Sequence, residues 1–228
     1  MTLWFLARAT GICAYLAFSV ATALGALAAA GGRPRLTRAV RPSSRRAARS
    51  GSRQRAADPT RAVDRRFVVH MLHRSAAITG LVLVAAHVTA VVVDSYVDVT
   101  VADALIPLLG EYKTVPVAVG TIALWLTVLV SVWGFARGRL AAGERTARTW
   151  RAVHATAYAA WAVMLLHGLL AGTDRATTWA RMLYVGGGCV VLAALVFRLA
   201  AQRRQRRAPT ALVRDRSATS ATIVARRS

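Results

Sequence analysis

Acidic residues and cysteines are scarce in this sequence. Nine Asp and Glu stand against 31 Lys and Arg, and the only cysteines are Cys13 and Cys189. Both cysteines lie in long apolar runs, so we expect neither a disulfide framework nor a cysteine metal cluster. No stretch alternates polar and apolar residues at every second position, which argues against the strands of a membrane barrel.

Apolar sequence is abundant instead. Hydrophobic residues make up 56% of the chain, and the mean hydropathy is positive. A helix needs about 20 residues to cross a hydrocarbon core of about 30 Å, and in lipid its backbone groups must be hydrogen-bonded within the segment. The sequence therefore predicts an all-α, polytopic transmembrane bundle of about five spans. The predicted spans are 3–30, 67–93, 115–136, 150–171 and 179–201.

Positive charge is concentrated in three blocks. Twelve arginines lie in 33–66, five in 137–151 and nine in 198–227. In the connection 94–113, four acidic residues stand against Lys113 alone, and the connection 172–178 has one acidic and one basic residue. By the positive-inside rule the three basic blocks are cytoplasmic. We therefore expect a multi-pass protein of the cell membrane with its N-terminus outside and its C-terminus in the cytoplasm.

The same pattern divides the chain into four parts. We expect a first transmembrane helix in 1–30, an Arg-rich, disordered cytoplasmic loop in 31–66, a transmembrane core in 67–201 and a basic, disordered cytoplasmic tail in 202–228. Residues 1–30 lack the positive n-region of a signal peptide, so we expect them to be retained. The loop has no interleaved aromatic residues, and anionic lipid headgroups account for arginines near helix ends. We therefore expect membrane lipid, and no nucleic acid, as a partner.

Histidines occur only in or beside the second and fourth spans, as His70, His73, His87, His154 and His167. Ionisable groups in lipid are costly, and they usually face a bundle interior where they serve a function. His73 and His87 are fourteen residues apart. On a helix this places them about 21 Å apart along the axis, with their side chains within about 40° of each other around it. One helix thus presents two imidazoles near opposite membrane surfaces.

The fourth span repeats this arrangement with His154 and His167, about 20 Å apart along the axis. In the expected topology both histidine helices run in the same direction. His73 and His154 then share one level, while His87 and His167 share the other. Two level-matched imidazole pairs suit two haem b groups, each ligated on both faces. Zinc or copper would normally recruit further carboxylates or thiolates, which are missing at this depth.

The second of these spacings does not fit an ideal helix. His154 and His167 are one residue closer in sequence than His73 and His87, which leaves His167 about 140° from the face of His154. A tightened turn, a kink or a rotated helix must therefore bring it round. His70 lies one turn before His73 and has no counterpart before His154. We expect His70 to be an interfacial histidine outside the site.

These motifs resemble a known family. HRSAAITGLVLVAAH at 73–87, WRAVHATAYAAWAVMLLHG at 150–168 and the following GTD at 172–174 are similar to the ferric reductase-like transmembrane domain. That domain is the haem b core shared by ferric reductases, NADPH oxidases and the haem-binding membrane subunit of a bacterial methionine sulfoxide reductase system. The resemblance covers about 67–200, with a looser echo at 4–11, and includes the unequal histidine spacings of the two ligand helices.

The resemblance implies two haem b groups, one between His73 and His154 and one between His87 and His167. It also implies electron transfer to an acceptor at the outer face, as the membrane component of an oxidoreductase with no catalytic residue of its own. No flavin- and nicotinamide-binding module is recognisable after residue 201, so we expect a separate electron donor, either a flavoprotein or a quinol. A haem-free metal-handling or structural membrane subunit with the same histidines stays open.

Three arginines are candidate partners of haem propionates. Arg74 adjoins a proposed ligand, and Arg151 lies about one turn before His154 on the same face; either could instead be a positive-inside residue. Arg8 lies in the apolar first span on the outer side, where it could pair with a propionate or an acidic loop, or extend to the surface. Residues 94–113 are too polar to span, and we expect an outer cap with a short helix near 101–110, or a plain solvated connection.

Overall fold

The computed structural model describes residues 2–30, 59–140 and 144–207. The elements in these ranges are all helices, and five are long and apolar enough to cross a membrane. This confirms the expected all-α bundle of a multi-pass membrane protein. The helices are α1 (Thr2–Ala30), α2 (Pro59–Val93), α3 (Val101–Leu105), α4 (Thr114–Leu140), α5 (Glu144–Ala155), α6 (Ala157–Ala171) and α7 (Thr178–Arg207).

The helix ends differ from the expected loop and tail at two places. Residues 59–66 and 202–207 are helical, as parts of α2 and α7, so helix extends into both segments expected to be disordered. Pro59 suits the first turn of a helix because its missing N–H is not needed there, and the arginines and glutamines that end α7 favour helix. The rest of the expected loop and tail lies outside the described residues.

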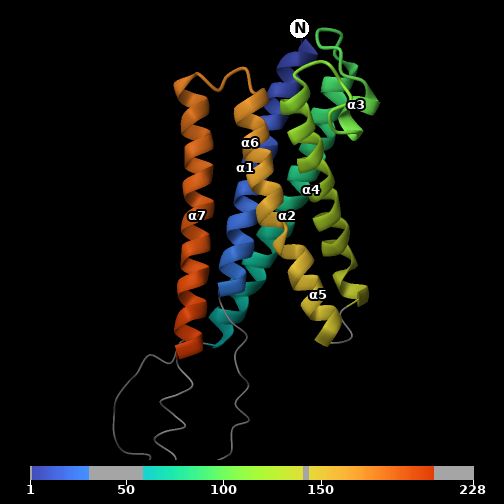
Figure 1. Cartoon of the computed structure of the whole chain (residues 1–228). Helices are drawn as coiled ribbons and strands as arrows, with labels where there is room; N and C mark the ends of the chain where they lie inside the picture. The colour runs from blue at the N-terminus through green and yellow to red at the C-terminus, as the bar shows by residue number, and fades with distance from the viewer. Residues whose placement is uncertain (1, 31–58, 141–143, 208–228) are drawn as a thin grey trace, which may run out of the picture.

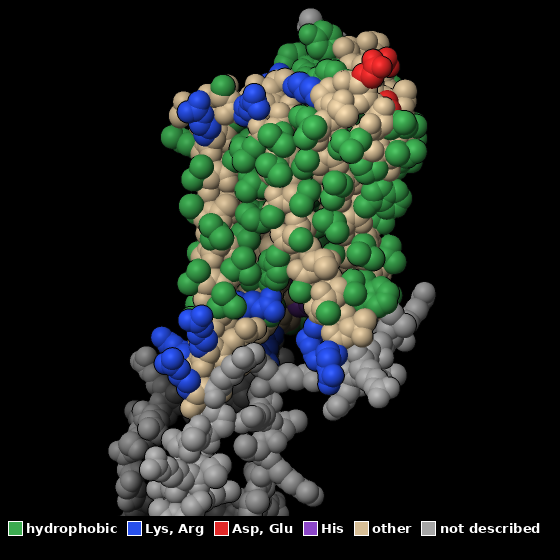
Figure 2. Space-filling model, viewed as in Figure 1, with side chains coloured by type: hydrophobic (Ala, Val, Ile, Leu, Met, Phe, Trp, Pro, Cys, Tyr) green, Lys and Arg blue, Asp and Glu red, His purple; other side chains and the backbone are tan. Residues whose placement is uncertain are grey.

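The two ends of the bundle differ in charge: Asp and Glu are visible at one end only, whereas Lys and Arg are visible at both (Figures 1 and 2). The start of α1, the connection 94–113 and the connection 172–177 lie together at the end that we call the acidic end. We call the opposite end, where α1 and α7 finish and α2 and α5 begin, the basic end. Figure 2 shows apolar side chains over the band between the two ends. Such a band suits contact with lipid.

Helix α1 lies centrally and packs on α2, α6 and α7, while α4 packs on α6 and α5. By contrast, α2 makes almost no direct contact with α4, α5 or α6. A polar and aromatic cluster joins α1 to α6 and α7: the Tyr15 hydroxyl donates to the Tyr184 carbonyl at 2.9 Å, and the Trp161 indole donates to Ser19 Oγ at 2.9 Å. Helix α1 thus links α2 to α6 and α7, whereas α2 and α6 do not pack closely on each other.

The fourth span consists of two helices, because α5 ends at Ala155 and α6 begins at Ala157. The Thr156 N–H bonds to the Val153 carbonyl at 3.1 Å, and the Thr156 hydroxyl donates to the same oxygen at 2.6 Å. Regular bonding resumes at Ala160. A side-chain bond to the preceding turn favours such a tightened turn. Of the three ways to reorient His167, the structure has a tightened turn, with a change of direction between the helices (Figure 1).

The connection between α2 and α4 forms a cap at the acidic end. Helix α3 begins with a capping box in which Thr100 and Asp103 bond to each other's backbone N–H. It ends at Leu105, earlier than the expected 110, because Pro107 disfavours helical backbone at the residue before it. Val97 and Val99 are buried, at 4% and 5% exposure. The segment therefore covers the bundle, as the cap alternative anticipated.

Candidate functional site

The four histidines expected to form the site lie together as two pairs. The ring centroids of His73 and His154 are 6.2 Å apart, and those of His87 and His167 are also 6.2 Å apart. The ring planes are almost perpendicular, at 76° and 75°. Two imidazoles that each bind one metal ion at about 2 Å, from opposite sides, would have centroids about 6 Å apart. Both pairs have that separation.

Three of the four rings are oriented by main-chain carbonyls. A carbonyl can only accept, so Nδ1 carries the proton and Nε2 keeps the lone pair that a metal requires. Metal-binding histidines typically donate their other N–H in this way, which fixes the tautomer and the ring orientation. The bonds run from Nδ1 of His73 to the Ala21 oxygen at 2.8 Å, of His87 to the Ala7 oxygen at 2.7 Å and of His167 to the Pro116 oxygen at 2.8 Å.

Each of these carbonyls is followed one helical turn later by a glycine against which the same ring lies. We call the carbonyl and its glycine an imidazole cradle. A Cβ atom at the glycine would lie 2.6 to 3.2 Å from a ring atom, so any larger residue would displace the ring. The cradles are Ala7 with Gly11 for His87, Ala21 with Gly25 for His73, and Pro116 with Gly120 for His167.

The cradle glycines were not recognised from the sequence. A signal was present, since Gly11 and Gly25 have the same spacing as His73 and His87 on the helix packed against them. Halfway between the two levels, Gly80 receives the Phe18 ring, because a Cβ there would lie 2.8 Å from that ring. The small residue at 80 thus admits a side chain of α1.

A cavity of about 210 Å³ surrounds the pair at the acidic end. It is lined by residues of α1, α2, α4 and α6 and by Tyr184 of α7; its walls are mostly apolar, with His87 and His167 among the lining residues. The cap closes it with Val97, Val99 and Tyr112. Burial, with a smaller contribution from Tyr96, raises the pKa of the Tyr112 phenol. This histidine pair thus lies in largely apolar surroundings.

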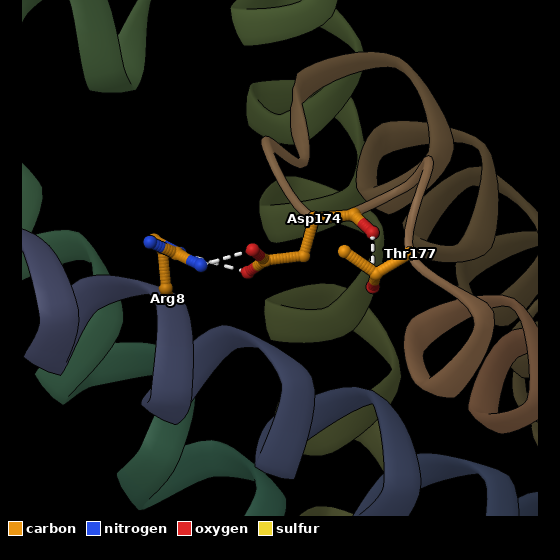
Figure 3. Close-up of polar contacts among 3 residues, drawn as sticks. All are labelled: Arg8, Asp174 and Thr177. Carbon is orange, nitrogen blue, oxygen red and sulfur yellow. Dashed lines mark hydrogen bonds and ion pairs between the residues drawn. The ribbon is translucent and has the colours of Figure 1, made fainter.

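Arg8 binds Asp174 (Figure 3), and both residues line this cavity. Its Nε donates to Oδ2 at 2.8 Å, and its Nη2 donates to Oδ1. The two side chains are 28% and 18% exposed, and the Thr177 hydroxyl donates to the Asp174 carbonyl at 2.7 Å. Of the partners considered for Arg8, the structure supplies the acidic loop, and the pair ties α1 to the connection between α6 and α7.

The remaining candidates at the basic end have fewer contacts. Arg74 and Arg151 are exposed and make no hydrogen bond or ion pair with the described residues. His70 is exposed and belongs to neither pair, as expected. Trp150 stacks on His154, with 4.8 Å between ring centroids and 17° between planes.

In the sequence, Arg198 is distinguished only as part of the basic block 198–227. In the structure it is half-buried on α7, where it donates to the Tyr158 hydroxyl. Its guanidinium carbon lies 5.5 Å from the centroid of the Tyr158 ring. This contact joins α6 to α7.

The side chains suit a planar metal group better than a bare ion. No group of three or more His, Cys, Asp or Glu in the described ranges could hold a metal ion, whereas protein zinc sites use three or four side chains. A metalloporphyrin brings its own equatorial ligands and needs an axial ligand on each face. The buried Trp133 Nε1 has no hydrogen-bond partner within the described part of the chain, and a porphyrin carboxylate is an acceptor of the kind it lacks.

Comparison with known proteins adds no relative. No family model, no curated protein and no solved structure matches this chain.

Proposed function

We propose that this chain is a transmembrane b-type cytochrome, ferric reductase-like, that carries electrons across the cell membrane through two bis-histidine haems. His73 and His154 would hold one haem, and His87 and His167 the other. The observation that carries the proposal is the pair of matching ring separations of 6.2 Å, at two levels of one bundle.

Haem, when bound, supplies the one-electron chemistry, and the protein controls ligation, orientation and dielectric. The Nδ1 bonds to main-chain carbonyls leave Nε2 of His73, His87 and His167 as the ligating atom. The mostly apolar walls of the cavity would give the haem at the acidic end a surrounding of low polarity. Arg8, paired with Asp174, would border this haem as one of the residues that line the cavity, and Arg74 and Arg151 could each hold a positive charge beside a propionate at the basic end.

The positive-inside rule places the basic end in the cytoplasm. Electrons would then enter from a separate donor, a flavoprotein or a quinol, and leave to an acceptor near the acidic end. In this arrangement the chain is the membrane component of an oxidoreductase system, and lipid surrounds its apolar band.

A reduced-minus-oxidised absorption spectrum of the purified protein, expressed with ample haem, tests the proposal. We expect a b-type spectrum and two haems per chain. The variants His87→Ala and His154→Ala should each retain one haem, whereas His70→Ala, on the same helix as His87 but outside both pairs, should retain two. A parent protein without a b-type band would overturn the proposal and favour a haem-free metal-handling or structural subunit. Two haems in both ligand variants would overturn the ligand assignment.

A further inference from the structure

Helix α4 carries a glycine pair with the spacing of the cradles on α1. Gly120 and Gly134 are separated by the same length of chain as Gly11 and Gly25. On a helix this spacing is about 21 Å and returns to within about 40° of the same face. On α1 both glycines border a histidine ring, whereas on α4 only Gly120 does.

Gly134 lies at the level of the His73 and His154 pair. Helix α4 runs antiparallel to α5 and α6, and Gly120 borders His167. Gly134 is one residue farther from Gly120 than His154 is from His167. The two distances along the helix axes therefore differ by about 1.5 Å. The second glycine thus reaches the level of the other ring pair.

The surroundings of the two α4 glycines differ. A Cβ at Gly120 would lie 2.6 Å from the His167 ring, but a Cβ at Gly134 would have no atom within 4 Å. Gly134 is nevertheless only partly exposed. The adjacent Trp133 has a buried indole N–H with no acceptor in the described ranges. Open space and an unused donor thus occur on α4 at the level of one imidazole pair.

We propose that Gly134 is a haem-packing position, and that the open space beside it receives an edge of the macrocycle held by His73 and His154. This inference rests on the proposed function, since it requires a haem at that level. A glycine is needed because a side chain at 134 would fill the same space. Gly134 is a positioning residue in this role and ligates nothing.

The test is Gly134→Ile, with Gly188→Ile on α7 as a matched control. A Cβ at Gly188 also has no atom within 4 Å, and Gly188 is partly exposed as well. At both positions a Cβ is clear of the described residues. We expect Gly134→Ile to fall from two haems to one and to lose one of two steps in a redox titration, with the midpoint potential of the remaining step unchanged. Gly188→Ile should keep both haems and both potentials.

Two haems with unchanged potentials in Gly134→Ile would overturn the inference and leave the proposed function intact, whereas a parent without haem would overturn the proposed function itself. If Gly134→Ile is not recovered as a monodisperse protein, Gly134→Ala replaces it. A methyl group should shift the potential of one haem and not of the other. Two unchanged potentials in that variant would also overturn the inference.

Discussion

At the scale of residues, the site depends on small contacts that orient large rings. The cradle at Pro116 and Gly120 shows the tightest of these, since a Cβ at Gly120 would lie 2.6 Å from the His167 ring. We predict that Gly120→Ala displaces this ring, costs about 1–3 kcal/mol of stability and reduces haem content at the acidic end. Spectroscopic haem quantification and thermal unfolding in detergent measure both effects.

The control for this prediction is Gly186→Ala, because a Cβ at Gly186 has no atom within 4 Å. It should keep full haem content. Equal haem content in Gly120→Ala and Gly186→Ala would show that the imidazole tolerates a methyl group, and the cradle would lose its role in orienting His167.

The ion pair of Arg8 and Asp174 is a second residue-scale device. Its two hydrogen bonds and partial burial place its coupling energy between those of exposed and buried pairs, at about 1–2 kcal/mol. A double-mutant cycle with Arg8→Gln, Asp174→Asn and the double variant measures this energy by thermal unfolding in detergent. A coupling energy near zero would mean that the pair does not stabilise the acidic end.

Residue identity made part of the site predictable. Histidines are rare in lipid, so His73, His87, His154 and His167 stood out, and their spacing indicated the pairing that the structure brings together. The cradle glycines did not stand out, because glycine is common in membrane helices and its role depends on what the neighbouring helix presents. The acid that pairs with Arg8 could not be singled out either, because five acidic residues lie in the two connections near it.

At the scale of elements, the break between α5 and α6 allows His154 and His167 to meet His73 and His87, although the first two are one residue closer in sequence. The Thr156 hydroxyl bonds to the Val153 carbonyl at 2.6 Å and favours the tightened turn just after His154. We predict that Thr156→Ala favours a regular helix and lowers haem content, because an uninterrupted helix turns His167 about 140° from His154. Haem quantification measures the loss.

Thr156→Ser keeps the hydroxyl and should restore the parent haem content. If Thr156→Ala bound as much haem as the parent, the turn would be fixed by packing of α6 on α4 and α1 and not by the side chain. The same measurement therefore separates a local cause of the break from a tertiary one.

The five candidate spans were predictable to within a few residues because their length and hydropathy can be read from the sequence. The break at Thr156 was not, since no glycine or proline marks it and threonine is tolerated within helices. The early start of α2 at Pro59 was missed because its first turns are rich in arginine and were assigned to the loop.

At the scale of the whole molecule, the bundle contains two similar helical units, with α7 packed on α1 beside them. In each, a helix with two glycines at the same spacing packs on a helix or helical segment with two histidines: α1 on α2, and α4 on α5 and α6. The open side of α2 faces the second unit, and the imidazoles meet there. This arrangement explains why both levels have the same ring separation.

The charge difference between the two ends predicts the orientation of the bundle, and the composition offers a direct measurement. Lys113 is the single lysine of the chain, and it is exposed at the acidic end. We predict that a membrane-impermeant amine reagent modifies Lys113 in right-side-out vesicles without permeabilisation, because the acidic end faces outward. Peptide mass mapping distinguishes this product from reaction at the N-terminal amine, and Lys113→Arg should lack it. Modification of Lys113 only after permeabilisation would place the acidic end inside, and would reverse the direction of electron flow in the proposed function.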